Sequence, residues 1–175
     1  MKNRIHCNRL LKAAFTMSGC LKYAIEGSSE EILNYSFAEH KMTIAQMAVH
    51  TMSWPRYFLS AEKPWEVDKF TCRPCKYPIK KDFINKVIDD GLLAIKEYLA
   101  SVDDKQLDIA NDGSKGKGYL VYRLIIHIMT HAEQIAFLRS MLEPDWNYSK
   151  QFGKMATELI GISYTTEKDS MFGES

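Results

Sequence analysis

The sequence predicts an all-α protein, a four-helix bundle. Along nearly the whole chain, apolar residues recur every three or four positions, and no long alternating pattern typical of a strand is found. Four of these amphipathic segments are long, and long helices of this kind bury their apolar stripes by packing side by side. The chain has 175 residues, of which 46% are hydrophobic and 26% charged, and this suits one globular domain with a substantial core.

The first long helix is expected at residues 8–25. Gly27 follows its last apolar residue, and glycine is common just past the end of a helix. Ser28 and Glu31 then have the spacing of a capping box, which predicts the start of a short second helix.

The second long helix is expected at residues 44–59. Thr43 and Gln46 form another capping box, which marks where this helix begins. Its inner stripe should consist of Met47, His50, Trp54 and Tyr57.

The second half of the chain predicts two more long helices separated by a glycine-rich loop. Residues 61–79 contain three prolines and should form a long connection, after which the third long helix runs over 81–102. The loop at 111–118 precedes the fourth long helix at 119–142, which should end before Pro144.

We expect residues 1–143 to form the bundle and residues 144–175 to form a C-terminal extension packed on the same domain. The extension has one amphipathic stretch, formed by Phe152, Met155, Ala156, Leu159 and Ile160. This stretch predicts a short fifth helix.

The fourth long helix carries two adjacent seams of apolar spacing. The first seam comprises Leu120, Leu124, His127, His131, Gln134, Leu138 and Met141. The second comprises Val121, Ile125, Ile128, Ala132, Ile135 and Leu142. So wide an apolar surface needs partners on two sides, and together with the amphipathic tail it predicts a homodimer, unless the tail covers the seam within one chain.

Two histidines in the first seam are the strongest indication of chemistry. His127 and His131 are four residues apart, so both imidazoles project from one helix face and suit chelation of a single metal ion. A buried polar group without a partner costs roughly 1–3 kcal/mol, so a pair within an apolar seam needs a joint explanation. The alternative is that each is a hydrogen-bonded core residue or that the pair lies on the surface.

His50 is the third candidate ligand. It lies near the middle of the second long helix, on the inner stripe, and mid-helix positions meet at similar depth in a bundle. Gly91 lies at the middle of the third helix's stripe, where a missing side chain would leave room for a ligand, although a packing role is equally consistent. His6 and His40 lie near element ends and are expected on the surface.

Two segments carry a resemblance to a known family. TIAQMAVH in the second long helix and LIIHIMTHAEQIAFLRSML in the fourth resemble the DinB-like metal-binding four-helix bundles, which include bacillithiol- and mycothiol-dependent S-transferases. The order of elements extends the resemblance over residues 8–142, but specific residue matches are confined to these two segments. The family's histidine triad and following glutamine correspond to His50, His127, His131 and Gln134.

The chain departs from the family pattern between the last histidine and the glutamine. The family has a basic or bulky residue followed by glycine there, whereas this sequence has Ala132 and Glu133. The departure leaves the metal ligands intact and bears on substrate handling.

The resemblance implies one nickel or zinc ion held by three histidines, with open positions for water. Three neutral nitrogen ligands suit several divalent transition metals, and three protein ligands with water are typical of catalytic rather than structural zinc. The expected function is a metal-dependent thiol S-transferase or a hydrolase, acting on a low-molecular-weight thiol or a small electrophile. The alternative is a non-catalytic metal-binding or assembly protein.

Other side chains near the triad could contribute to a substrate site. Trp54 and Tyr57 could line a pocket, although core packing is the competing interpretation. Gln134 shares the histidine seam and is expected to orient a ligand or water, because a buried amide needs partners.

Cys72 and Cys75 form the main rival motif. A C-x-x-C pair can be a redox pair or half of a zinc site. Cys7 and Cys20 do not provide a second close pair, and the strand–turn–helix context of a thioredoxin-like site is lacking. A redox protein using Cys72 and Cys75 is therefore the second alternative.

The charge balance excludes several classes of partner. With 23 basic and 22 acidic residues, the net charge of +1 gives no electrostatic footprint for nucleic acid or an anionic membrane. No apolar run approaches the roughly 20 residues that span a bilayer, and the first 15 residues lack the apolar segment of a signal peptide. We expect a cytoplasmic protein whose thiols are reduced.

Overall fold

A computed structural model describes residues 4–39, 41–60, 78–107 and 117–147, and every regular element in these ranges is an α-helix. Four helices are long: α1 (Ile5–Ile25), α3 (Ile44–Leu59), α4 (Lys81–Ser101) and α6 (Lys117–Leu142). Two are single turns, α2 (Glu30–Leu33) and α5 (Asp104–Leu107). The all-α prediction is confirmed, and each long helix begins and ends within three residues of its expected bounds.

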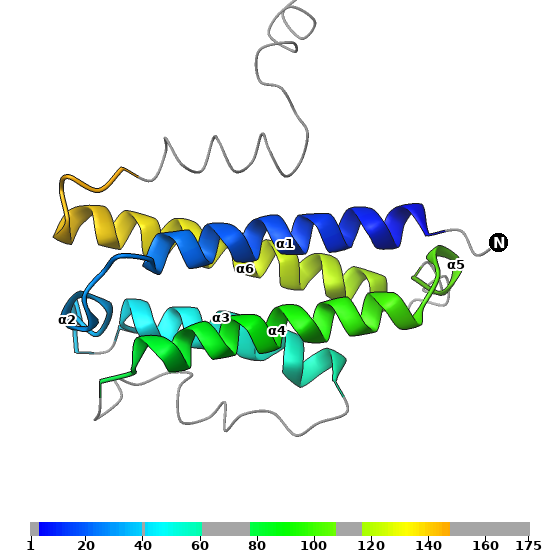
Figure 1. The fold of residues 1–175 in the computed structure, drawn as a ribbon, viewed down its shortest axis with the longest axis horizontal. Helices are drawn as coiled ribbons and strands as arrows, with labels where there is room; N and C mark the ends of the chain where they lie inside the picture. Colours follow the sequence, from blue (N-terminus) through cyan, green and yellow to red (C-terminus); the bar gives the residue numbers. More distant parts are fainter. Residues whose placement is uncertain (1–3, 40, 61–77, 108–116, 148–175) are drawn as a thin grey trace, which may run out of the picture.

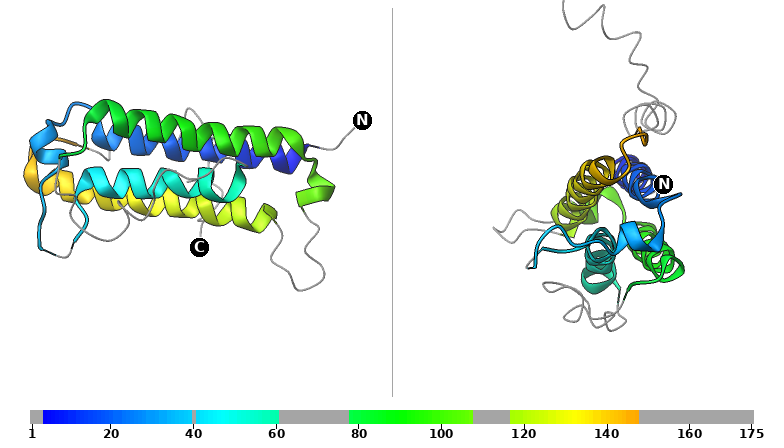
Figure 2. Two further views of the ribbon diagram at one scale, coloured as in Figure 1. Left: turned by 90° about the horizontal axis from the view of Figure 1, so that it is seen from below. Right: turned by 90° about the vertical axis from the view of Figure 1, so that its left-hand side faces the viewer.

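The four long helices lie side by side around one core (Figures 1 and 2). α1 packs against α4 and α6, and α3 packs against the same two helices. α3 and α4 run in one direction along the bundle, whereas α1 and α6 run in the other (Figure 1). Because α3 and α4 are consecutive but parallel, the end of α3 and the start of α4 lie far apart along the bundle (Figure 1).

Several expectations concern residues outside the described ranges. These are most of the 61–79 connection, most of the 111–118 loop, and the extension beyond residue 147. None of the described helices combines the length and the apolar character needed to cross a membrane.

Side-chain caps fix where two of the helices begin. The predicted capping box at α3 is confirmed: Thr43 accepts from the Gln46 backbone N–H, and the Gln46 side chain accepts from the Thr43 N–H. The short helix α2 is also present, but its N-cap is Ser29, which accepts from the Ile32 N–H. The expected cap at Ser28 was therefore wrong by one residue.

The single turn α5 was not expected from the sequence. It caps the N-terminal end of α1. Asp103 and Gln106 form a reciprocal capping box in front of it. The buried carboxylate of Asp104 then accepts hydrogen bonds from the backbone N–H groups of His6 and Cys7, at 3.0 and 2.8 Å. These two N–H groups lie in the first turn of α1, where they have no partner within the helix.

Arg139 of α6 caps the C-terminal end of α1. Its side chain is only 4% exposed and donates to the carbonyl oxygens of Ala24 and Glu26, at 3.0 and 2.6 Å. It also pairs with Glu143, and its guanidinium lies 4.2 Å from the centre of the Trp146 ring. A buried cation thus satisfies carbonyls that α1 leaves unpaired at its C-terminus.

Gly91 marks a close approach between α4 and α3. A Cβ atom at this position would lie 2.3 Å from the carbonyl oxygen of Met52, so only glycine fits without moving the backbone. Of the two roles considered for Gly91, the structure supports packing, because Met52 fills the space expected for a ligand.

Candidate metal centre

The three predicted histidines come together between two helices. His50 projects from α3, and His127 and His131 project from successive turns of α6. The ring centres lie 5.1 Å apart for His50 and His127, 5.4 Å for His50 and His131, and 4.6 Å for the pair on α6. α3 and α6 pack against each other directly, which brings one mid-helix histidine opposite the pair.

The spacing of the nitrogen atoms fits a shared metal ion. One ligand atom from each ring lies within 4.8 Å of the others, and no other such group of three is found in the part of the chain that the structure describes. The Nε2 atoms of His127 and His131 are 3.0 Å apart. Two nitrogens bound to one metal ion by bonds of about 2.1 Å are separated by about 3.4 Å at the tetrahedral angle of zinc and by about 3.0 Å at the right angle of an octahedral site.

The hydrogen-bonding capacity of the ring nitrogens also favours a shared metal ion. Two neutral imidazoles can share a 3.0 Å contact without an ion only if one ring nitrogen carries hydrogen and donates to the other. A metal ion instead uses both lone pairs. In addition, the buried Nδ1 atom of His131 has no hydrogen-bond partner among the described residues. The donor set therefore fits a divalent transition metal, which favours imidazole nitrogen.

The triad lies at the edge of the core rather than at its centre. The second seam of α6 forms the core, with Val121, Ile128, Ala132 and Ile135 all buried. The histidine seam is less covered: His127 and His131 are half-buried, and Gln134 and Met141 are exposed. The expectation that the histidines occupy the bundle core is corrected, because the second seam points at the centre and the first at the groove beside α3.

Partial burial favours the metal-binding form of all three side chains. Burial, together with the neighbouring His131, His50 and Arg123, lowers the pKa of His127 to about 4. Burial also lowers the pKa of His50, with a contribution from His131. The pKa of His131 falls through burial, while Gln134 acts in the opposite direction. The imidazoles are therefore neutral near pH 7, as a ligand must be.

Trp54 lies against the His50 ring. Its indole N–H lies 3.2 Å from Nε2 and 3.3 Å from Nδ1 of His50, one turn earlier in α3. The two rings meet edge to face, and Phe58 stacks on the indole. Trp54 therefore contacts one member of the triad directly.

A cavity of about 540 Å³ opens beside the triad. It is lined by His50, Trp54 and Phe58 from α3 and by Tyr119, Leu120, Arg123, Leu124 and His127 from α6. Its size lies within the range of small-molecule sites. Arg123 and Tyr119 were not identified from the sequence, although both lie one or two turns before His127 on the same face.

The remaining candidate residues do not line this cavity. Tyr57 is 49% exposed and packs on Trp54 without lining the cavity. Gln134 is exposed, so the argument from a buried amide was wrong, although it still influences His131. His6 is exposed, as expected.

Three of the residues weighed for function cannot be placed. His40, Cys72 and Cys75 lie outside the described residues. Cys7 and Cys20 are buried, and neither forms a disulfide bond within the described part of the chain.

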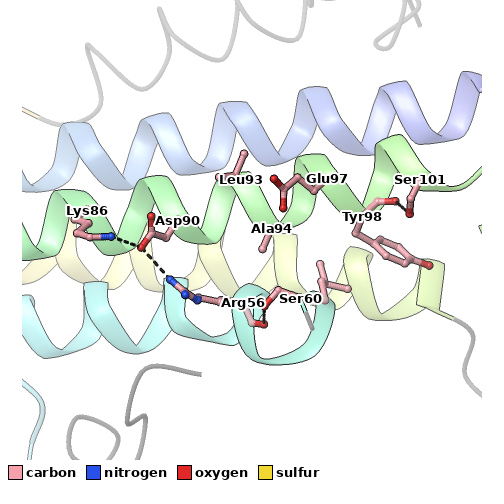
Figure 3. Close-up of a pocket in the computed structure, with 10 residues that line it drawn as sticks. Arg56, Ser60, Lys86, Asp90, Leu93, Ala94, Glu97, Tyr98 and Ser101 are labelled. Carbon is pink, nitrogen blue, oxygen red and sulfur yellow. Dashed lines mark hydrogen bonds and ion pairs between the residues drawn. The ribbon is translucent and has the colours of Figure 1, made fainter. Parts of the chain in front are cut away.

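A second hollow lies between α3 and α4, away from the histidines (Figure 3). Arg56 pairs with Asp90 across the two helices, at 3.1 Å, and Lys86 pairs with the same carboxylate, at 2.7 Å (Figure 3). These ion pairs account for the charged groups at one end of the hollow and give it a structural role in joining α3 to α4.

Comparison of the chain with protein-family models, with curated proteins and with solved structures finds no match. The resemblance to the DinB-like family therefore stays a prediction based on the two motif segments.

Proposed function

We propose that this protein is a divalent-metal-dependent enzyme that holds one zinc or nickel ion with His50, His127 and His131. The observation that carries the proposal is the convergence of three neutral imidazoles, two of which, His50 and His127, line a cavity large enough for a small molecule. Three protein ligands beside an accessible space are typical of catalytic metal sites, whereas structural zinc sites are closed by a fourth protein ligand.

Among the two reaction classes considered, the lining of the cavity favours thiol transfer over hydrolysis. No carboxylate lies among the described residues that line the cavity or join the triad. Hydrolysis commonly uses such a group as a general base. Transfer of a thiol to an electrophile does not need a general base from the protein, because the thiol gives its proton to solvent. The sulfur then bonds to the electrophilic carbon, and the leaving group departs with the electron pair of the broken bond.

The ion would supply Lewis acidity and lower the pKa of a coordinated thiol. The chain's own residues bind and orient. Trp54 packs edge to face against the His50 ring, and Phe58, Leu120 and Leu124 offer an aromatic and aliphatic wall to an apolar electrophile. These separate roles of the ion and the cavity residues support the thiol S-transferase activity that the resemblance implies.

The test is a turnover assay with metal-loaded protein. Cysteine and other small thiols are mixed with monochlorobimane, and conjugation is followed by fluorescence with zinc or nickel restored to chelated protein. We expect conjugation to depend on metal and to be lost in His127→Ala, while His6→Ala behaves as wild type. Metal that binds stoichiometrically without turnover of any thiol or ester would favour the non-catalytic alternative.

The redox alternative needs its own comparison. Cys72→Ser and Cys75→Ser should keep both metal content and conjugation. Loss of activity in either variant with metal content intact would replace the proposed function by the redox one.

A further inference from the structure

Among the described residues that line the cavity beside the histidines, Arg123 is the only charged one. The others are aromatic or aliphatic side chains and the two neutral imidazoles of His50 and His127. None of the described carboxylates forms an ion pair with Arg123. An unpaired guanidinium at an otherwise apolar cavity is an arrangement that selects for a negatively charged group on the ligand.

The exposed side chain of Arg123 contacts Tyr119 at the edge of the cavity. Its Nη1 atom lies 3.4 Å from the hydroxyl oxygen of Tyr119, and the guanidinium carbon lies 6.0 Å from the centre of the same ring. Tyr119 itself lines the cavity. Arg123 and Tyr119 are four residues apart in α6, so the pair forms one edge of the cavity along a single helix face.

The triad lies at the opposite end of the same cavity wall. Arg123 precedes His127 by one turn, so their backbone positions are separated by about 6 Å along α6. The Arg123 side chain extends this separation, because it is directed toward Tyr119 and away from His127. A ligand that reaches both ends is therefore a small molecule several bonds long, with its polar groups at its two ends.

We propose that the cavity binds a small apolar organic acid, whose carboxylate is held by Arg123 and whose other end faces His50 and His127 of the triad. This assignment of substrate class rests on the proposed function, because it places the reacting end of the molecule at the metal site. A guanidinium matches a carboxylate with two parallel N–H···O bonds. One positive charge balances one carboxylate, whereas a phosphate monoester brings close to two negative charges and finds no second cation among the described lining residues.

The binding step is tested apart from the metal, on full-length protein. 4-Phenylbutyrate serves as the probe, and 4-phenylbutan-1-ol is its neutral counterpart. Binding is followed by the indole N–H signal of Trp54 in ¹⁵N-labelled protein, identified by its loss in Trp54→Phe. We expect the acid to shift this signal saturably at millimolar concentrations and to bind more tightly than the alcohol.

Arg123→Gln tests the role of the charge, and Arg9→Gln is the matched control, because Arg9 is exposed on α1 and does not line the cavity. We expect Arg123→Gln to weaken binding of the acid by roughly tenfold or more, the usual effect of removing a charge-assisted hydrogen bond. Binding of the alcohol should be unchanged in Arg123→Gln, and Arg9→Gln should leave both probes unaffected.

Two further measurements separate the sources of binding. The acid should bind chelated protein as tightly as metal-loaded protein, so failure of the metal proposal leaves this result standing. Affinity that is lost on chelation but retained in Arg123→Gln would overturn the assignment, since the carboxylate would then occupy the metal. Phenyl phosphate that binds more tightly than the acid through Arg123, or the absence of any saturable shift with the acid, would overturn it as well.

Discussion

The substitution Gly91→Ala distinguishes a packing role from a ligand-binding role at the contact between α3 and α4. The added Cβ would lie 2.3 Å from the Met52 carbonyl oxygen and 3.0 Å from the Met52 methyl carbon. The first contact involves backbone, which cannot rotate away, so the two helices must separate. We expect an overpacking cost of about 3 kcal/mol, at the upper end of the usual range, because the obstacle is rigid.

Alanine also favours the helix by about 1 kcal/mol over glycine, so the net loss in the free energy of unfolding should be about 2 kcal/mol. For a chain of this size that corresponds to a melting temperature lower by roughly 4–8 °C. The difference between Lys96→Gly and Lys96→Ala, at an exposed position of the same helix, measures the propensity contribution alone.

Urea denaturation followed by circular dichroism gives both free energies. Metal content should be unchanged in Gly91→Ala, because Met52 and His50 project from different faces of α3. A variant as stable as wild type, or more stable, would refute the reasoning and show that there is unfilled space beside Gly91.

Three further predictions concern stability. Arg139→Met should lower the free energy of unfolding by about 3 kcal/mol, because it leaves Glu143 and the carbonyls at the end of α1 without their buried cation, while exposed Arg9→Met should be neutral in the same urea titration. In the presence of chelator, the free energy of unfolding should fall as the pH drops from about 6.5 towards 4, because the unfolded chain then binds a proton that native His127 excludes; His127→Phe should reduce this slope, and an unchanged slope would contradict the burial argument. Chelation should leave the helical circular dichroism intact, since the core of aliphatic side chains carries the fold and metal adds a few kcal/mol by mass action; unfolding on chelation would be the opposite result.

Helical periodicity predicted the four long helices, and residue spacing predicted the pair His127 and His131, because both depend on relations within one helix. The pairing of His127 with His131 follows from one turn of α6, and the start of α3 follows from Thr43 and Gln46 alone. His50 joined the pair because mid-helix positions meet in a bundle.

Features that depend on how helices face one another were harder to predict. Two adjacent apolar seams on α6 show that the buried surface is wide, but not which seam points at the core, so the histidines were placed too deep. In the sequence, Arg139 is indistinguishable from an ordinary charged residue, because its role depends on the end of α1 lying beside it. The turn α5 is different: Asp103 and Gln106 have the same capping-box spacing as Thr43 and Gln46, so the signal was present in the sequence.

Elemental analysis of protein purified without a histidine tag tests the central claim most directly. The account predicts one zinc or nickel ion per chain in the wild type and in His6→Ala, and a sharp loss of metal in His50→Ala, His127→Ala and His131→Ala. Full metal occupancy in the double variant His127→Ala/His131→Ala, or a wild-type protein that takes up neither metal after chelation and reloading, would contradict it.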